Sequence, residues 1–306
     1  MVTHFAMLGA FCTDKKDEAK RMYSCRNFEV HGRRLAVMEW GDSSAVPVIA
    51  LHGWLDNAAT FMQLAPLLSG VRLIAIDMAG HGASGHRPSG SPYYIWDNVA
   101  DVLAVADQLG VARFSVLGHS MGAGVAMMLA ACVPDRVAQL FLIEGLAPLV
   151  YEAEKLPSLM AEALNKQRRL GRRTLRPYDS FEQAVEARVN GRWPVSREAA
   201  QWLVERGLER CSGGWRWRSD SALLLPSVVR LSEAQVEAFL LAVRAPVELV
   251  LGDEGIDPAR MQRLLPLLTD ARLHVLAGNH HLHLEAGAAA EIATLIINSL
   301  RKPCMH

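Results

Sequence analysis

Short apolar runs alternate with helical patterns along most of the chain, and this alternation restricts the fold more than any other sequence feature. Runs such as Val46–Leu51 and Val71–Ile76 carry few polar side chains, which is typical of strands buried on both faces of a parallel sheet. Strands are predicted at residues 28–30, 35–40, 46–51, 71–76, 113–117, 139–143, 247–251 and 272–276. Helices are predicted between them, at residues 58–68, 95–109, 121–132, 258–268 and 288–300. The pattern therefore predicts an α/β fold with a mostly parallel, doubly wound, eight-stranded sheet.

One long segment interrupts this alternation. Residues 148–240 contain no convincing strand pattern and are interpreted as helices and loops, inserted between two strands of the sheet. The sheet and its own helices are then expected in residues 26–147 and 241–306. Residues 1–25 precede the first strand pattern and are interpreted as an N-terminal arm with partial disorder.

Charge and cysteine content exclude several classes of protein. Lys+Arg and Asp+Glu number 32 each, so the basic excess of a general nucleic-acid binder is absent, and the arginines of residues 148–240 are interleaved with glutamates. No apolar run approaches the ~18 residues of a membrane-spanning helix. The cysteines are scattered without a CxxC pair, at positions 12, 25, 132, 211 and 304. We therefore expect a cytoplasmic protein with reduced thiols, without a disulfide framework or a zinc site.

A candidate nucleophile lies between a predicted strand and a predicted helix. The motif G-x-S-x-G is met by Gly118-His119-Ser120-Met121-Gly122. A serine in this context sits on a tight, strained strand-to-helix turn, where side chains two positions before and after it would collide. The turn presents Oγ at the amino end of the helix, whose N–H groups favour developing negative charge. Ser120 is therefore the predicted nucleophile.

The loop after the run Val46–Leu51 is the second candidate part of the site. It reads His52-Gly53-Trp54, and a loop at this place is expected to supply an N–H group to an oxyanion. The predicted donors are the backbone N–H groups of Trp54 and Met121. His52 is interpreted as a hydrogen-bonded residue that shapes the loop rather than as a catalyst.

A histidine-rich segment follows the last predicted strand. It reads Gly278-Asn279-His280-His281-Leu282-His283. Neither HExxH nor a similar framework accompanies it, so a metal site is not expected, and no cofactor is needed. His280, the first histidine after the turn, is the predicted general base, because a loop here can reach a serine at the same edge of the sheet.

Two regions can supply the acid that orients this imidazole. Glu144 directly follows the strand pattern that ends at Ile143, and it is the favoured candidate. The alternative is the loop after residue 251, which carries Asp253, Glu254 and Asp257. Either choice keeps the chain order Ser, acid, His.

Taken together, these motifs resemble those of the α/β-hydrolase superfamily over residues 26–302. The matching segments are His52–Trp54, Asp77–Ser84, Gly118–Gly122 and Gly278–His280. Within the superfamily, the chain resembles the serine hydrolase-like subgroup, in the segments His52–Ala58, Pro92–Tyr94 and Gly278–His283.

The resemblance has implications for individual residues. It assigns Ser120 as nucleophile and His280 as base, the latter supported by the spacing to Glu285, and it makes residues 148–240 a helical cap over the pocket. Most relatives carry their acid as G-x-x-D, and counting from Gly252 this position is Gly255 here. Some relatives instead carry the acid where Glu144 stands.

The expected function is that of a serine hydrolase that cleaves a carboxylic ester or related acyl compound through an acyl-enzyme. The expected partner is a small acyl substrate, with a homodimer as a further expectation and neither nucleic acid nor a membrane span. A carbon–carbon bond hydrolase or a thioesterase would use the same triad. A non-catalytic, receptor-like protein with this fold is the alternative from another class, because a fold alone does not confer activity.

Overall fold

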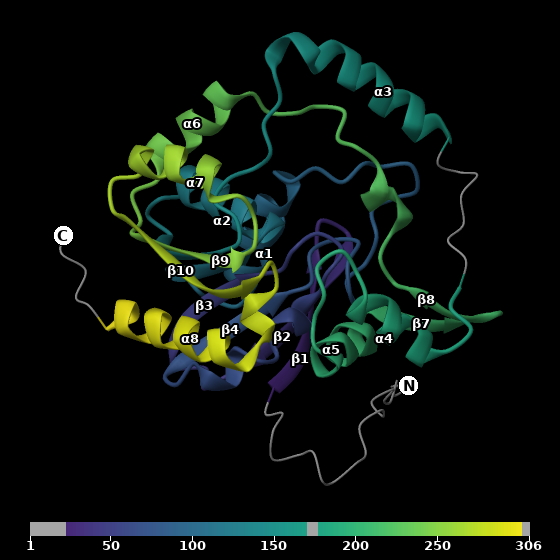
Figure 1. Ribbon diagram of the computed structural model, residues 1–306, viewed down its shortest axis with the longest axis horizontal. Helices are drawn as coiled ribbons and strands as arrows, with labels where there is room; N and C mark the ends of the chain where they lie inside the picture. Colours follow the sequence, from purple (N-terminus) through teal and green to yellow (C-terminus); the bar gives the residue numbers. More distant parts are fainter. Residues whose placement is uncertain (1–22, 170–176, 302–306) are drawn as a thin grey trace, which may run out of the picture.

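The computed structural model describes residues 23–169 and 177–301, and its centre is an eight-stranded sheet (Figure 1). The strand order is β1-β2-β4-β3-β5-β6-β9-β10, with antiparallel pairing of β1 with β2 and of β2 with β4, and parallel pairing elsewhere. The strands are β1 Tyr23–Val30, β2 Arg33–Trp40, β3 Val46–Leu51, β4 Val71–Ile76, β5 Phe114–His119, β6 Val137–Ile143, β9 Val247–Glu254 and β10 Ala271–Asn279. The predicted fold class, a mostly parallel eight-stranded α/β sheet, is confirmed.

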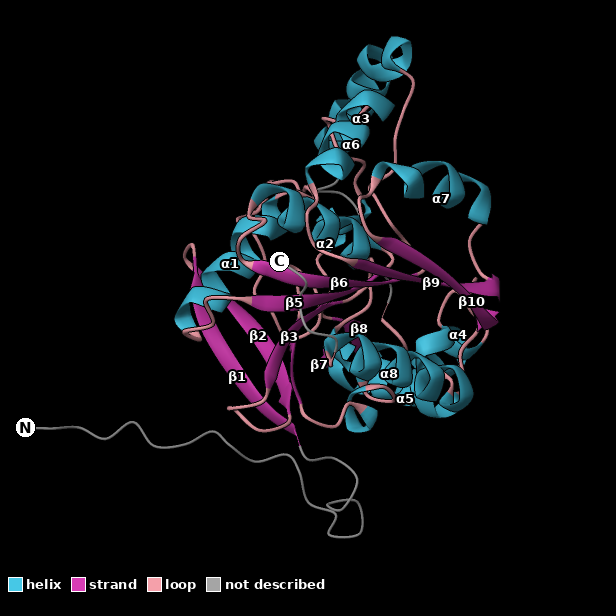
Figure 2. Cartoon of the chain, turned by 90° about the vertical axis from the view of Figure 1, so that its left-hand side faces the viewer, coloured by secondary structure: helices cyan, strands magenta, loops and turns pink. Residues whose placement is uncertain are grey.

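Helices cover both faces of the sheet, as Figure 2 shows. One face packs against α1, α2, α6 and α7, and the other packs against α8. The helices are α1 Asp97–Gln108, α2 Met121–Cys132, α3 Leu156–Arg169, α4 Phe181–Val189, α5 Arg197–Gly207, α6 Glu233–Ala242, α7 Pro258–Leu264 and α8 Ala286–Leu300. No helix within the two described ranges is long and apolar enough to cross a membrane.

Helix α2 is buried almost all round, which explains why its sequence lacks an amphipathic pattern. It begins directly after Ser120 and lies between the sheet and other helices of the same face. Its residues from Gly122 to Ala130 are all buried. Small residues such as Gly122 and Gly124 let this helix approach neighbouring backbone closely. The burial anchors the amino end of α2, and with it the turn that carries Ser120.

The expectation of continuous helices at residues 58–68 and 258–268 is wrong. The first segment forms two 3₁₀ turns, η1 Ala58–Phe61 and η2 Ala65–Leu67. The second stops as an α-helix at Leu264 and continues as the 3₁₀ turn η6 Leu265–Leu267. The turns η2 and η6, where the expected helices are interrupted, each contain a proline, at positions 66 and 266. Proline has no N–H group to donate, and its ring clashes with the preceding helical turn.

The segment at residues 148–240 departs from its prediction in two ways. It contains a two-stranded hairpin, β7 Leu208–Cys211 with β8 Gly214–Trp217, so the prediction that it has no strand is wrong. Four-residue strands are too short for their alternation to stand out from the preceding helix. Helix α6 crosses the predicted boundary at residue 240 and packs on α2, so the core resumes before that boundary.

The amino-terminal boundary also lies earlier than predicted. Strand β1 begins at Tyr23, and Cys25 pairs with Met38 of β2. The last three residues of the expected arm, 23–25, therefore belong to the sheet. Residues 1–22 lie outside the described part of the chain.

Candidate active site

Ser120 occupies a strained turn between β5 and α2. Its φ is +53° and its ψ is −113°, a conformation that residues other than glycine rarely adopt. A Cβ atom at Gly118 would lie 2.5 Å from the carbonyl oxygen of Gly122, and one at Gly122 would overlap the carbonyl oxygen of Leu51. The two glycines are therefore required by close backbone packing, and the strain at Ser120 is sustained by the buried elements on either side.

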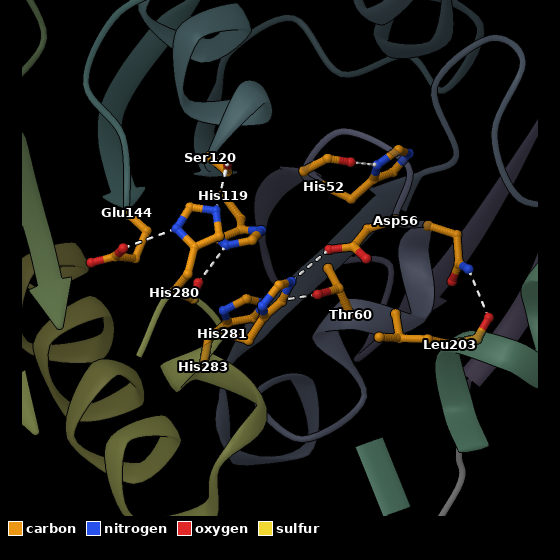
Figure 3. Close-up of polar contacts among 12 residues, drawn as sticks. His52, Asp56, Thr60, His119, Ser120, Glu144, Leu203, His280, His281 and His283 are labelled. Carbon is orange, nitrogen blue, oxygen red and sulfur yellow. Dashed lines mark hydrogen bonds and ion pairs between the residues drawn. The ribbon is translucent and has the colours of Figure 1, made fainter. Parts of the chain in front are cut away.

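Three side chains from different elements meet at this turn (Figure 3). The Oγ of Ser120 lies 3.0 Å from Nε2 of His280, and Nδ1 of His280 lies 2.9 Å from Oε2 of Glu144. Because a carboxylate accepts hydrogen bonds, Nδ1–H of the neutral ring donates to Glu144, which leaves Nε2 free to accept from the hydroxyl. His280 and Glu144 are both buried. The hydroxyl, the imidazole ring and the carboxylate therefore form one continuous chain of contacts.

Glu144 is held at its position by the backbone around it. It follows β6 with a φ of +53°, and its Oε1 accepts a hydrogen bond of 2.6 Å from the N–H of Gly252. Its Oε2 accepts another, of 2.9 Å, from the N–H of Ile256. A Cβ atom at Gly255 would overlap the Glu144 carboxylate. The side chain of Glu144 therefore fills the space in front of position 255, where most relatives are expected to carry the acid.

The three alternative acids lie elsewhere. Oδ1 of Asp253 accepts a hydrogen bond of 2.8 Å from the N–H of Gly278, and Oδ1 of Asp257 caps α7 by accepting from Ala259. Glu254 is exposed at the end of β9. None of the three contacts His280 through a hydrogen bond or ion pair within the described residues.

The loop after β3 packs directly against the elbow. A Cβ atom at Gly53 would lie 2.9 Å from Nδ1 of His119 and 3.4 Å from Cβ of Ser120. The side chain of Trp54 is 52% exposed, and its indole N–H donates to the carbonyl oxygen of Leu223 at 3.1 Å. Gly53, the residue before Trp54, thus packs against the turn that carries Ser120, and Met121 follows Ser120 as the first residue of α2.

His52 fixes the orientation of this loop. Its Nε2 accepts a hydrogen bond of 3.0 Å from the N–H of Met78, so the proton is on Nδ1, which lies 2.7 Å from the carbonyl oxygen of Gly53. Burial lowers the pKa of His52, which keeps the ring neutral. In a trans peptide the C=O and N–H groups point in opposite directions. Holding the Gly53 oxygen toward His52 therefore turns the N–H of Trp54 away from that ring.

A cluster of buried histidines packs against the loop that bears His280. The contacts of this cluster were not predicted from the sequence. Nε2 of His119 lies 2.8 Å from the carbonyl oxygen of His280, and the rings of His119 and His283 lie 4.3 Å apart. Nε2 of His283 lies 2.7 Å from Oγ1 of Thr60. Burial, with further contributions from neighbouring histidines, holds the pKa of His119 and of His283 well below the ordinary value. The crowding of histidines at 280–283 was the available sequence signal.

Asp56 joins this cluster to the inserted segment. Its Oδ1 accepts a hydrogen bond of 2.7 Å from the Arg188 guanidinium on α4, and its Oδ2 lies 3.1 Å from Nε2 of His281. Burial alone would raise the pKa of Asp56, but Arg188 and His281 outweigh it and lower the pKa below its ordinary value. The loop that bears Trp54 and the loop that bears His280 are thereby tied to the same helix of the insertion.

One set of side chains among the described residues has metal-ligand spacing. It consists of Asp56, His119 and His281, whose ligand atoms lie within 4.8 Å of one another. The guanidinium of Arg188 already contacts both Asp56 and His281, the latter at 3.0 Å. A positive charge at that distance opposes a metal cation, so we assign the set to the structural support of the two loops.

A cavity of about 640 Å³ opens at the serine. Ser120 and His280 lie in its wall, and much of the remaining wall is aromatic or aliphatic, including Trp54, Tyr93, Trp96 and Leu231. The cavity is bounded by the core and by residues 148–151 and 223–231 of the insertion. Its size and apolar wall suit a small organic molecule rather than a polymer.

The fold and the site geometry agree with the comparisons to known proteins. A family model described as alpha/beta hydrolase fold matches residues 46–286. The chain therefore belongs to the α/β-hydrolase superfamily, and within it to the serine hydrolase-like subgroup.

Two curated relatives and two solved structures illustrate the similarity. A serine hydrolase-like protein of Danio rerio is 34% identical over 80% of this chain and 79% of its own length, and one of Dictyostelium discoideum is 32% identical over 84% and 76%. The crystal structure of a hypothetical protein from Pseudomonas aeruginosa PAO1 is 45% identical, covers 91% of this chain and 99% of its own, and has a TM-score of 0.87. The thioesterase domain from the curacin biosynthetic pathway is 26% identical, covers 90% and 100%, and has a TM-score of 0.81.

Proposed function

We propose that the chain is a serine hydrolase that cleaves a carboxylic ester or a related acyl compound, with Ser120 as nucleophile, His280 as base and Glu144 as acid. The observation that carries the proposal is the continuous pair of contacts from Oγ of Ser120 through the His280 ring to the Glu144 carboxylate, at 3.0 and 2.9 Å. Membership of a hydrolase family supports the reaction class.

The mechanism follows from this geometry. His280 takes the proton of Ser120 through Nε2 while Oγ attacks the acyl carbon, and Glu144 stabilises the resulting imidazolium through Nδ1–H. The protonated ring then gives its proton to the leaving group, which departs and leaves an acyl group on Ser120. A water molecule, deprotonated by the same ring, hydrolyses this acyl-enzyme and restores the serine.

The backbone N–H groups of Trp54 and Met121 are the proposed oxyanion donors. Met121 is the first residue of α2, where an N–H group has no partner within the helix. The N–H of Trp54 is oriented through the contact of His52 with the preceding carbonyl. A donor of this kind contributes about 3–4 kcal/mol to stabilisation of the transition state.

The test of this function is hydrolysis of p-nitrophenyl esters of increasing acyl length. We expect turnover by the native chain, with a preference for acyl groups that fit a cavity of about 640 Å³. Ser120→Ala should lower kcat by at least about 10³-fold. Ser158→Ala, a matched change at an exposed position of α3, should leave kcat within about twofold of the native value.

Thioester cleavage is a second candidate on the same triad. The similarity to a thioesterase domain, at 26% identity over nearly its whole length, supports it. An oxygen ester and a thioester of the same acyl group, assayed side by side, distinguish the two.

Carbon–carbon bond hydrolysis on the same triad remains a prediction, as do the cap role of residues 148–240, the cytoplasmic location and the homodimer. Binding of an acyl ligand without turnover or serine labelling would favour the receptor-like alternative.

A further inference from the structure

Two arginines line the otherwise largely apolar cavity next to Ser120, and the serine mechanism uses neither. They are Arg260 of α7 and Arg230, in the loop before α6. Both lie against the same short segment, because Arg260 donates to the carbonyl oxygen of Pro148 at 2.8 Å and Arg230 lies 4.4 Å from the ring centre of Tyr151. A backbone hydrogen bond from Tyr151 to Leu231 holds this segment beside Arg230.

Arg260 is incompletely satisfied. Among the residues that the structure describes, its Nε is buried without a hydrogen-bond partner, and its guanidinium has one acceptor, the carbonyl oxygen of Pro148. Burial lowers the pKa of Arg260, which means that the charged side chain loses hydration that the protein does not replace in full. A guanidinium carries five N–H donors, so most of them remain available to a ligand.

The carboxylates near the two arginines are engaged elsewhere. Glu233 lies 3.8 Å from Arg263, and Glu162 lies 2.5 Å from Lys166. Asp257, which also lines the cavity, directs Oδ1 at the N–H of Ala259. Across residues 23–169 and 177–301, no carboxylate forms an ion pair with Arg260 or Arg230 within 4 Å.

We propose that the cavity selects acyl groups that end in a carboxylate, and that Arg260, assisted by Arg230, binds this carboxylate while Ser120 attacks the ester carbonyl. The planar fork of a guanidinium matches a carboxylate, and the bond strengthens in an apolar surrounding. The substrate class is therefore the half-ester of a dicarboxylic acid. Hydrolysis adds water across the ester bond and releases the dicarboxylic acid and an alcohol. This inference rests on the proposed hydrolase function and names its substrate class.

The experiment compares mono-p-nitrophenyl esters of glutaric, adipic and suberic acid with the methyl p-nitrophenyl diesters of the same acids. The two series share the acyl chain and the leaving group, and they differ at the far end, where a carboxylate is replaced by its neutral methyl ester. We expect the native chain to show at least about tenfold higher kcat/KM for the acids, because a hydrogen bond between charged groups is stronger than one between neutral groups.

Variants test the assigned residues. Arg260→Gln should reduce kcat/KM at least about tenfold for the acid series and less than about twofold for the diesters. Arg230→Gln should reduce the acid series by a smaller factor. Arg244→Gln is the matched control, because it removes an exposed arginine that does not line the cavity. It should leave both series unchanged.

The outcomes separate the two proposals. Ser120-dependent hydrolysis of the diesters without a preference for the acids, or an equal loss on both series in Arg260→Gln, would overturn the substrate class and leave the hydrolase intact. Absence of Ser120-dependent hydrolysis in both series would overturn the hydrolase. Calorimetry on Ser120→Ala with monomethyl adipate then tests the carboxylate site without turnover. Binding that is lost on adding Arg260→Gln supports the site, and binding that persists, or is absent in Ser120→Ala itself, contradicts it.

Discussion

Glu144 leaves strand β6 in a left-handed conformation, and this single backbone angle directs its carboxylate toward His280. Two N–H groups from the loop after β9 fix the same carboxylate. Gly255 faces it from that loop, where a side chain would overlap it. Side chains at positions 144 and 255 would therefore occupy the same space. We expect that a carboxylate can enter this space either from the end of β6 or from the loop after β9.

Replacing this acid is the prediction at the residue scale. Glu144→Gln should reduce kcat on the order of 10³- to 10⁴-fold, because an amide can no longer stabilise the imidazolium or hold the ring in the required tautomer. Steady-state ester hydrolysis measures the loss. Asp257→Asn, Asp253→Asn and Glu254→Gln should each retain most of the activity. Retention of normal kcat by Glu144→Gln would contradict the assignment.

A relocated acid makes the same test sharper. Glu144→Gly suits the positive φ, and Gly255 has no positive φ that would strain an aspartate. The double variant Glu144→Gly, Gly255→Asp should regain at least about tenfold of the activity that Glu144→Gly loses, since its carboxylate enters the vacated space. The double variant Glu144→Gly, Gly255→Asn introduces a side chain of the same shape without the charge. It should regain none of the lost activity.

At the scale of elements, the sequence predicted the parts that depend on local pattern. Seven strands of the large sheet were found within about three residues of their observed bounds, most of them because buried parallel strands are continuous apolar runs, whereas the antiparallel edge strand β1 was predicted only over its last three residues. The elbow was found because G-x-S-x-G stood between a strand and a helix. The hairpin β7–β8 was missed because its strands are short, and the choice of Glu144 over the three later acids was left open because it depends on contacts between β6 and the loop after β9.

The link between α4 and the loops of the site gives the prediction at this scale. Arg188→Met leaves the buried Asp56 carboxylate without its cation and should lower the free energy of unfolding by about 3 kcal/mol. Adding Asp56→Asn should recover part of that loss. Urea denaturation measures both. Arg197→Met removes exposed ion pairs to Glu182 and Glu186 and should leave the free energy of unfolding almost unchanged. Equal effects of the two arginine changes would contradict the assigned link.

For the whole molecule, the buried histidines predict how stability depends on pH. Burial lowers the pKa of His52, His119 and His283, and with a contribution from His52 it lowers the pKa of His81 to about 3. The unfolded chain binds these protons near pH 6.5, the ordinary histidine value. The contribution of these histidines to stability is therefore complete well above pH 6.5 and is lost as pH falls through that value, with a slope that approaches about 1.4 kcal/mol per pH unit for each histidine at lower pH.

Urea midpoints at pH 7.5, 6.5 and 5.5 check this dependence. The midpoint should fall by a small amount between the first two values and by a clearly larger amount between the second and the third. His31→Asn changes an exposed histidine and should leave the fall unchanged. A midpoint that stays level down to pH 5.5 would mean that these histidines are not buried in the neutral form.

Mass spectrometry after brief exposure to a fluorophosphonate probe tests most directly whether the hydroxyl at position 120 is activated by the neighbouring imidazole. The native chain should carry one adduct, on the peptide that contains Ser120, and His280→Asn should label at least about 100-fold more slowly because the general base is gone. An adduct on another residue, or labelling of Ser120 at the same rate with and without the imidazole, would contradict this account.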